Sequence, residues 1–136
     1  MEMTETDEVL SANLEFYRAF AARDATAMDA LWARRLPVAC THPGWEPLRD
    51  RRGIVESWRR ILDGSGAPGV MCHDEQVFLY GDVAIVVCEE EMRGGTLAAT
   101  NVFAKEDGAW RIVHHHAGPM APRRLKAPPR RSSRLN

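Results

Sequence analysis

The chain has 136 residues, of which 45% are hydrophobic and 27% are charged, as in ordinary globular domains. This length suits one domain with its own core, and no run approaches the roughly 20 apolar residues that a membrane span needs. The N-terminus is acidic and lacks a signal-peptide pattern, and the three cysteines include no C-x-x-C pair. We therefore expect a cytoplasmic protein with reduced thiols and no membrane partner.

The net charge of −1 conceals a strongly basic C-terminal end. From Ala121 onward there are six Lys and Arg residues and no acid, whereas the first 120 residues hold 12 basic and 19 acidic residues. The end is also rich in Pro and Ser, so we expect one folded domain over residues 1–119 and a disordered tail over 120–136. Such a tail could bind nucleic acid or anionic lipid. We favour a solvated extension, because no aromatic residue alternates with the basic ones to stack on a base.

Hydrophobic residues recur at helical spacing in the first half of the chain. Thr26 and Asp29 suit the capping box of a helix, and Asp50 suits the N-cap of another. A Gly-rich and Pro-rich loop follows the last of these helices. The pattern predicts three helices, over residues 6–22, 27–33 and 51–62. It also predicts one short strand, over residues 36–41.

In the second half of the chain, apolar and polar residues alternate as they do in strands. Dipeptides that favour tight turns separate these segments. The turns are Gly81-Asp82, Gly94-Gly95 and Asp107-Gly108. They predict four strands, over residues 70–80, 83–92, 96–105 and 110–117. Helices followed by consecutive antiparallel strands indicate an α+β fold, in which a strongly curved, cone-like antiparallel sheet packs on three helices from the N-terminal half.

The period of two along a strand predicts which side chains share a face. A two-residue turn at Asp107-Gly108 pairs Phe103 with Ile112, Asn101 with His114, and Ala99 with His116. His115 then lies on the opposite face. A two-residue turn at Gly94-Gly95 adds Glu90 to the face of Asn101, whereas a loop longer by one residue would present Glu89 and Glu91 instead.

The run His114-His115-His116 raises the question of a metal site. His114 and His116 would share a side, and with His42 they would suit Zn²⁺ with an open water position. However, His-x-His on a strand is a short and unspecific pattern. We favour histidines that are hydrogen-bonded along a pocket wall, and we expect no metal and no cofactor.

The segment TNVFAKEDGAWRIVHHH, residues 100–116, resembles the corresponding hairpin of SnoaL-like domains. It also resembles the hairpin of the association domain of calcium/calmodulin-dependent kinase. With the order of elements, residues 6–119 resemble the nuclear transport factor 2-like superfamily. This resemblance implies a curved sheet around one hydrophobic pocket, and a homodimer that pairs through the outer sheet face, here carrying Thr100, Val102 and Val113.

A weaker similarity to ketosteroid isomerase bears on the chemistry. His42, in Thr41–Pro47, falls where that enzyme has its catalytic aspartate, and Asn101 falls where it has a protonated aspartic acid. The tyrosine of its oxyanion hole aligns with Phe16, and Tyr17 should point about 100° away on the helix. Steroid isomerisation is therefore not expected.

The resulting candidate site has His42 as general base, Asn101 as hydrogen-bond donor to a carbonyl, and His114 beside them on the sheet. The candidate ligand-binding residues are Trp32, Trp45, Trp58, Tyr17, Phe103, His116 and Glu90. For Trp32 and Trp58, which lie on apolar helical faces, a core position is favoured over a contact with ligand. We expect a cofactor-independent isomerase, cyclase or dehydratase acting on a small carbonyl-bearing substrate. The alternative is a non-catalytic domain that binds a small ligand or assembles homo-oligomers.

Overall fold

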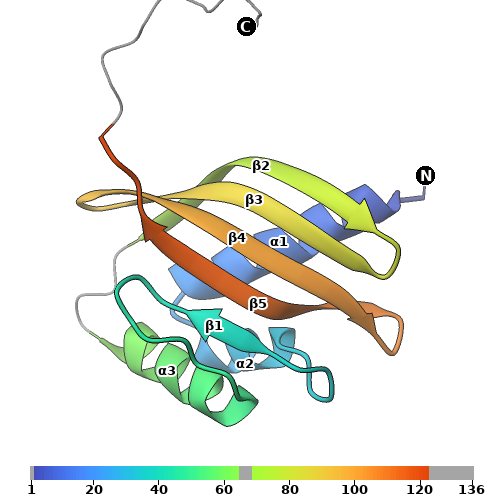
Figure 1. The fold of residues 1–136 in the computed structure, drawn as a ribbon, viewed down its shortest axis with the longest axis horizontal. Coiled ribbons are helices and arrows are strands. Elements are labelled where there is room, and N and C mark those ends of the chain that lie inside the picture. Colours follow the sequence, from blue (N-terminus) through green and yellow to red (C-terminus); the bar gives the residue numbers. More distant parts are fainter. Residues whose placement is uncertain (1, 65–68, 123–136) are drawn as a thin grey trace, which may run out of the picture.

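The computed structural model describes residues 2–64 and 69–122. It contains three helices and five strands, namely α1 (Glu5–Ala21), α2 (Ala25–Leu31), β1 (Ala39–Thr41), α3 (Arg51–Asp63), β2 (Val70–Tyr80), β3 (Val83–Met92), β4 (Gly95–Glu106) and β5 (Ala109–Pro119). Figure 1 shows α1 running behind the curved sheet, with α2 and α3 beside β1. The expected α+β fold is confirmed. Most of the basic tail lies outside the described residues.

Side-chain caps decide where the helices begin. Asp50 accepts a hydrogen bond from the Gly53 amide and starts α3, as predicted. α2 begins earlier than predicted, because Asp24 has an extended backbone and its carboxylate accepts from the Ala27 amide at 3.0 Å. The prediction of Thr26 as the cap of this helix is therefore wrong.

The sheet has the strand order β1-β5-β4-β3-β2. The four long strands are antiparallel neighbours, as expected, and β1 adds a short parallel edge beside β5. Positive φ angles at Gly81, Gly94 and Gly108 close the three hairpins. Met92 pairs with Gly95, so the β3–β4 turn contains two residues and Glu90 faces the core, one of the two alternatives that the sequence left open.

A β-bulge interrupts the hairpin of β4 and β5. Phe103 pairs with Ile112, as predicted, but the next pair is Val102 with His114. Val113 is therefore an extra residue on β5, without a partner on β4. Because side chains alternate along a strand, one inserted residue reverses the face of every residue beyond it.

The bulge corrects the predicted positions of the histidines. Asn101 pairs with His115, and not with His114 as the regular register predicted. His115 is 1% exposed on the inner face of the sheet. His114 and His116 lie on the outer face, so neither of them contributes to the core side of the sheet.

Aromatic rings fill the space between the helices and the inner face of the sheet. Trp58 of α3 meets Phe20 and Phe16 of α1 edge-on, with ring centroids 4.9 and 5.5 Å apart. Trp32 and Phe103 are also fully buried in this cluster. The core therefore joins α1 and α3 to β3, β4 and β5.

A carboxylate ties the chain after α2 to the β4–β5 hairpin. Glu106 accepts hydrogen bonds from the backbone amides of Arg34, Arg35 and Leu36, at 2.8–3.2 Å. These bonds hold the pKa of Glu106 at about 2, well below its ordinary value of 4.5. Among the described residues, no helix combines the length and the apolar character that crossing a bilayer requires.

Candidate functional site

A cavity of about 200 Å³ lies between α1, α3, the loop after β1 and the inner face of the sheet. We call it the inner cavity. It is lined by Phe20, His42, Pro43, Trp45, Trp58, Ile61, Glu90, Met92, Leu97 and His115. Its volume is below the range of about 300–1,000 Å³ that drug-sized ligands occupy. The lining contains no Lys or Arg, so the inner cavity suits a small molecule without negative charge.

His42 reaches the inner cavity from the residue that follows β1. Its Nε2 lies 2.8 Å from Ser57 Oγ on α3, and that hydroxyl donates to the Ile54 carbonyl. Since the Ser57 proton is already used, His42 Nε2 donates to Ser57, and Nδ1 is left as the proton acceptor of the ring. Burial lowers the pKa of His42 to about 4, so the imidazole is neutral at pH 7.

His115 and Glu90 form a buried pair in the wall of the inner cavity. Their Nε2 and Oε2 atoms are 3.8 Å apart, and each residue is 1% exposed. Burial lowers the pKa of His115 to about 3 and raises the pKa of Glu90 above its ordinary value. The sequence placed Glu90 near this site but predicted His114, and not His115, as the histidine on this face. Nothing in the residues around Val113 indicates the bulge that exchanges the two.

Tyr17 completes the surroundings of Glu90. Its hydroxyl lies 2.6 Å from Glu90 Oε2. Phe16 and Tyr17 are both buried, on the face of α1 that packs against the sheet. Tyr17 does not line the inner cavity, and it contacts the cavity wall through Glu90.

Asn101 is enclosed in the core and is not part of the cavity lining. Its Nδ2 donates to Asn13 Oδ1 at 2.9 Å and to the Tyr17 hydroxyl at 3.1 Å. Its Oδ1 lies 2.6 Å from His115 Nδ1. Both ends of the amide are therefore occupied by protein groups, so the geometry does not support direct donation to a substrate carbonyl.

Sequence reasoning missed Asn13 altogether. It is 1% exposed and lies on the face of α1 that also carries Phe16, Tyr17 and Phe20. A polar residue at helical spacing with three buried aromatics is a detectable signal, because a buried amide needs hydrogen-bond partners.

The remaining candidates divide between the inner cavity, the core and the outer face. Trp45 and Trp58 line the inner cavity, Trp45 being 40% exposed at its mouth. Trp32 and Phe103 are core residues away from the cavity lining. His114 and His116 line a separate hollow on the outer face, together with Thr100.

The three histidines that were considered as zinc ligands are not brought together. His42 lies on the inner side of the sheet, whereas His114 and His116 lie on the outer side. Within residues 2–64 and 69–122, no three His, Cys, Asp or Glu side chains are grouped so that they could hold a metal ion.

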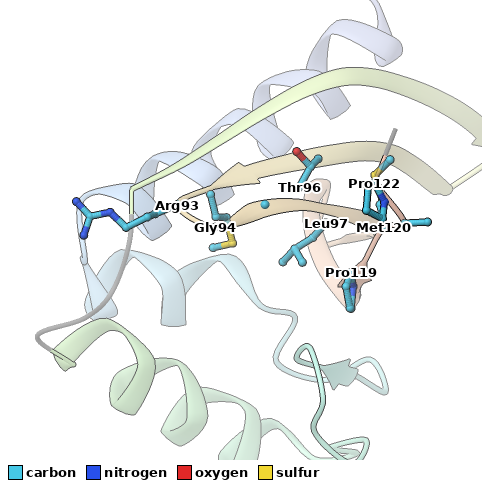
Figure 2. A pocket seen from close by; sticks show the side chains of 10 residues that line it. Arg93, Gly94, Thr96, Leu97, Pro119, Met120 and Pro122 are labelled. Atoms are coloured by element: carbon cyan, nitrogen blue, oxygen red, sulfur yellow. The ribbon is translucent and has the colours of Figure 1, made fainter. Parts of the chain in front are cut away.

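A larger hollow of about 630 Å³ lies where the β3–β4 turn meets the chain after β5. Figure 2 shows Leu97 and Thr96 pointing to opposite sides of the strand, and Arg93 extending away from the other labelled residues. Arg93 is its only titratable lining residue, so it offers no acid–base pair. Met92 and Leu97 also line the inner cavity, so the two spaces share a wall.

Comparisons with known proteins agree with this architecture. A family model for the SnoaL-like domain matches residues 9–122. A structure from Streptomyces avermitilis, described as a candidate dehydratase of the NTF2-like family, is 27% identical with a TM-score of 0.78. The match covers 86% of this chain and 97% of the chain in that structure. A candidate calcium/calmodulin-dependent protein kinase type II association domain from Thiobacillus denitrificans is 32% identical with a TM-score of 0.74, over 82% of this chain and 94% of its own.

A curated relative is the F-box protein SKIP8 of Arabidopsis thaliana. It is 28% identical over 117 residues, which are 85% of this chain. The chain spans 51%, about half, of the length of that relative.

Proposed function

The chain belongs to the SnoaL-like domain family, and from this premise we propose that it is an enzyme that moves protons on a small uncharged substrate without a cofactor. The reaction class is that of a dehydratase or an isomerase. The observation that carries this proposal is the pairing of His115 Nε2 with Glu90 Oε2 at 3.8 Å in the wall of the inner cavity. The candidate dehydratase from Streptomyces avermitilis supports the same reaction class.

The two side chains suit opposite tasks. His115 is neutral, because burial lowers its pKa, and can accept a proton from the carbon beside a carbonyl group. Glu90 has a raised pKa and can donate a proton to a departing hydroxyl. In a dehydration, the C–H and C–O bonds break, a C=C bond forms and water leaves. Transfer of the proton from His115 to Glu90 then restores both groups.

The walls of the inner cavity favour an uncharged, flat substrate. Trp45 and Trp58 offer aromatic faces, and neither histidine of the lining is charged at neutral pH. An anionic substrate would be desolvated there without a cationic partner. His42 supplies a second proton acceptor through Nδ1, with its ring centroid 6.4 Å from that of His115. In this proposal Asn101 holds His115 and does not touch the substrate.

The test is a screen of small β-hydroxy ketones, followed by the absorbance of the conjugated enone that dehydration produces. We expect His115→Ala and Glu90→Gln to lower kcat by roughly 10²–10⁴-fold, the range typical of a lost general acid or base. His73→Ala is the matched control, because His73 lies exposed on β2 beside Glu91 and away from the cavity. Binding of such ketones without turnover by the unmodified protein would instead favour a ligand-binding domain.

Association of two copies is a second candidate function. The outer face carries an apolar row across three strands, in which Phe78 pairs with Ile85 and Ile85 pairs with Val102. Val87 lies one row away and is 45% exposed. The 32% identity to a candidate kinase association domain supports a homodimer through this face. A cytoplasmic location remains part of the proposal, supported by three free cysteine thiols.

A further inference from the structure

A directional chain of hydrogen bonds runs from α1 through β4 to His115. Asn101 Nδ2 donates to Asn13 Oδ1, so Asn101 Oδ1 is the atom that faces His115 Nδ1, at 2.6 Å. A carbonyl oxygen can only accept a hydrogen bond, and Nδ1 must therefore carry the ring proton. The lone pair of the neutral imidazole is then on Nε2, the nitrogen that lies nearest to Glu90.

We propose that Asn13 is a positioning residue that sets the tautomer of His115 through the amide of Asn101. The inference rests on the proposed function, in which His115 Nε2 is the general base. Asn13 is itself oriented by a contact from its Nδ2 to Cys72 Sγ, at 3.7 Å. Its Oδ1 is thus directed at Asn101, with both amides at most 1% exposed.

The opposite orientation of the Asn101 amide would disable the base. Its Nδ2 would then donate to His115 Nδ1, and the ring proton would move to Nε2, which could no longer accept a proton from a substrate. Asn13 Oδ1 opposes this orientation, because two carbonyl oxygens would face each other in the core without a proton between them. The oxygen of Asn13 is therefore the group that selects the productive tautomer.

The same orientation also directs the hydroxyl proton of Tyr17. Asn101 Nδ2 donates to the Tyr17 oxygen at 3.1 Å, and Tyr17 donates onward to Glu90 Oε2 at 2.6 Å. If the amide of Asn101 turned, its Oδ1 would compete with Glu90 for the hydroxyl proton. One acceptor atom on α1 thus organises both members of the proposed acid–base pair, although Asn13 touches neither of them.

The experiment reads the tautomer directly from the nitrogen chemical shifts of the His115 ring, in the histidine-labelled full chain by long-range ¹H–¹⁵N correlation. We expect the unmodified protein to carry the proton on Nδ1. Asn13→Leu, which has a similar size but no acceptor, should move a measurable fraction of molecules to the Nε2-protonated form. Asn13→Asp keeps the acceptor and should retain the original signature. Leu14→Ala is the matched control, because Leu14 is the neighbour of Asn13 on α1 but is 55% exposed and outside the hydrogen-bond chain, so the His115 signature should not change.

Kinetics give an independent reading of the same variants on a substrate found by the screen above. A wrong tautomer removes the base in the transition state and not substrate binding, so Asn13→Leu should lower kcat by on the order of 10²-fold or more. KM should stay within about twofold, and Asn13→Asp should recover most of kcat.

The outcomes separate this inference from the proposed function. A proton on Nε2 in the unmodified protein would overturn the inference, and that measurement needs no variant to fold. An unchanged His115 spectrum in folded Asn13→Leu would overturn it as well. An Asn13-dependent tautomer in a protein that turns over no substrate would support the positioning role and contradict the enzymatic one.

Discussion

Tyr17 Oη lies 2.6 Å from Glu90 Oε2 and joins α1 to β3 inside the core. Removing this hydroxyl in Tyr17→Phe leaves a buried carboxyl group without its donor, which should cost about 1–3 kcal/mol of unfolding free energy in a urea titration. The hydrogen bond from Tyr17 lowers the pKa of Glu90, so its loss should raise that pKa further. Tyr80→Phe, at the exposed tyrosine of β2, should change neither quantity.

The buried histidines predict a loss of stability in mild acid. His115 keeps its neutral form to about pH 3 in the folded chain, whereas its ordinary pKa is 6.5. The unfolded chain therefore binds more protons, and stability falls as the pH drops from 6.5 towards 3. His42 adds a smaller effect between 6.5 and about 4. The unfolding free energy of the unmodified protein should fall between pH 7 and pH 4. In His115→Gln this fall should be smaller by about 3 kcal/mol.

The control for this pH effect is His73→Gln on the exposed part of β2. It should leave the urea midpoint at pH 7 close to that of the unmodified protein, because an exposed ion pair contributes little to stability. Equal slopes for the unmodified protein and His115→Gln would contradict a histidine that is buried in its neutral form.

Glu106 predicts a separate loss of stability at lower pH. Its pKa is depressed from 4.5 to about 2 by backbone amides of the chain after α2, so its contribution is present above pH 4.5 and is lost as the pH falls towards 2. Glu106→Gln should be less stable than the unmodified protein at pH 7, and the difference should shrink below pH 3. Urea midpoints at the two pH values test this. Asp107→Asn, at the exposed neighbour that pairs with Arg35, should have little effect at either pH.

We predict a homodimer that forms through the outer face of the sheet and that dissociates when one charged residue is introduced there. Val87 points outward on β3, where it pairs with Thr100 of β4. A lysine there would be desolvated in a sheet-to-sheet interface, so Val87→Lys should convert a dimer to a monomer in light scattering at micromolar concentration. Leu14→Lys places the same change on the exposed side of α1 and should leave the mass unchanged. A monomeric mass for the unmodified protein would contradict the association proposal.

The long strands and their turns could be predicted from the sequence, because alternation and turn residues act over short distances. β2 and β3 begin and end at the predicted residues. Asp50 likewise caps α3 as predicted, through a contact with an amide three residues away. The fold class followed from these local features, whereas the inward position of Glu90 was one of two alternatives that the sequence left open.

The content of the candidate site was decided by the tertiary structure. The bulge at Val113 has no glycine or other local marker, yet it exchanges His114 for His115 on the inner face. Asn13 and Tyr17, one helical turn apart on the buried face of α1, meet Asn101 and Glu90 only because α1 packs against the sheet. The sequence by itself therefore determined the strands and the presence of histidines on β5. Which histidine meets Glu90 depended on one inserted residue, because a single insertion reverses the alternation of a strand beyond it.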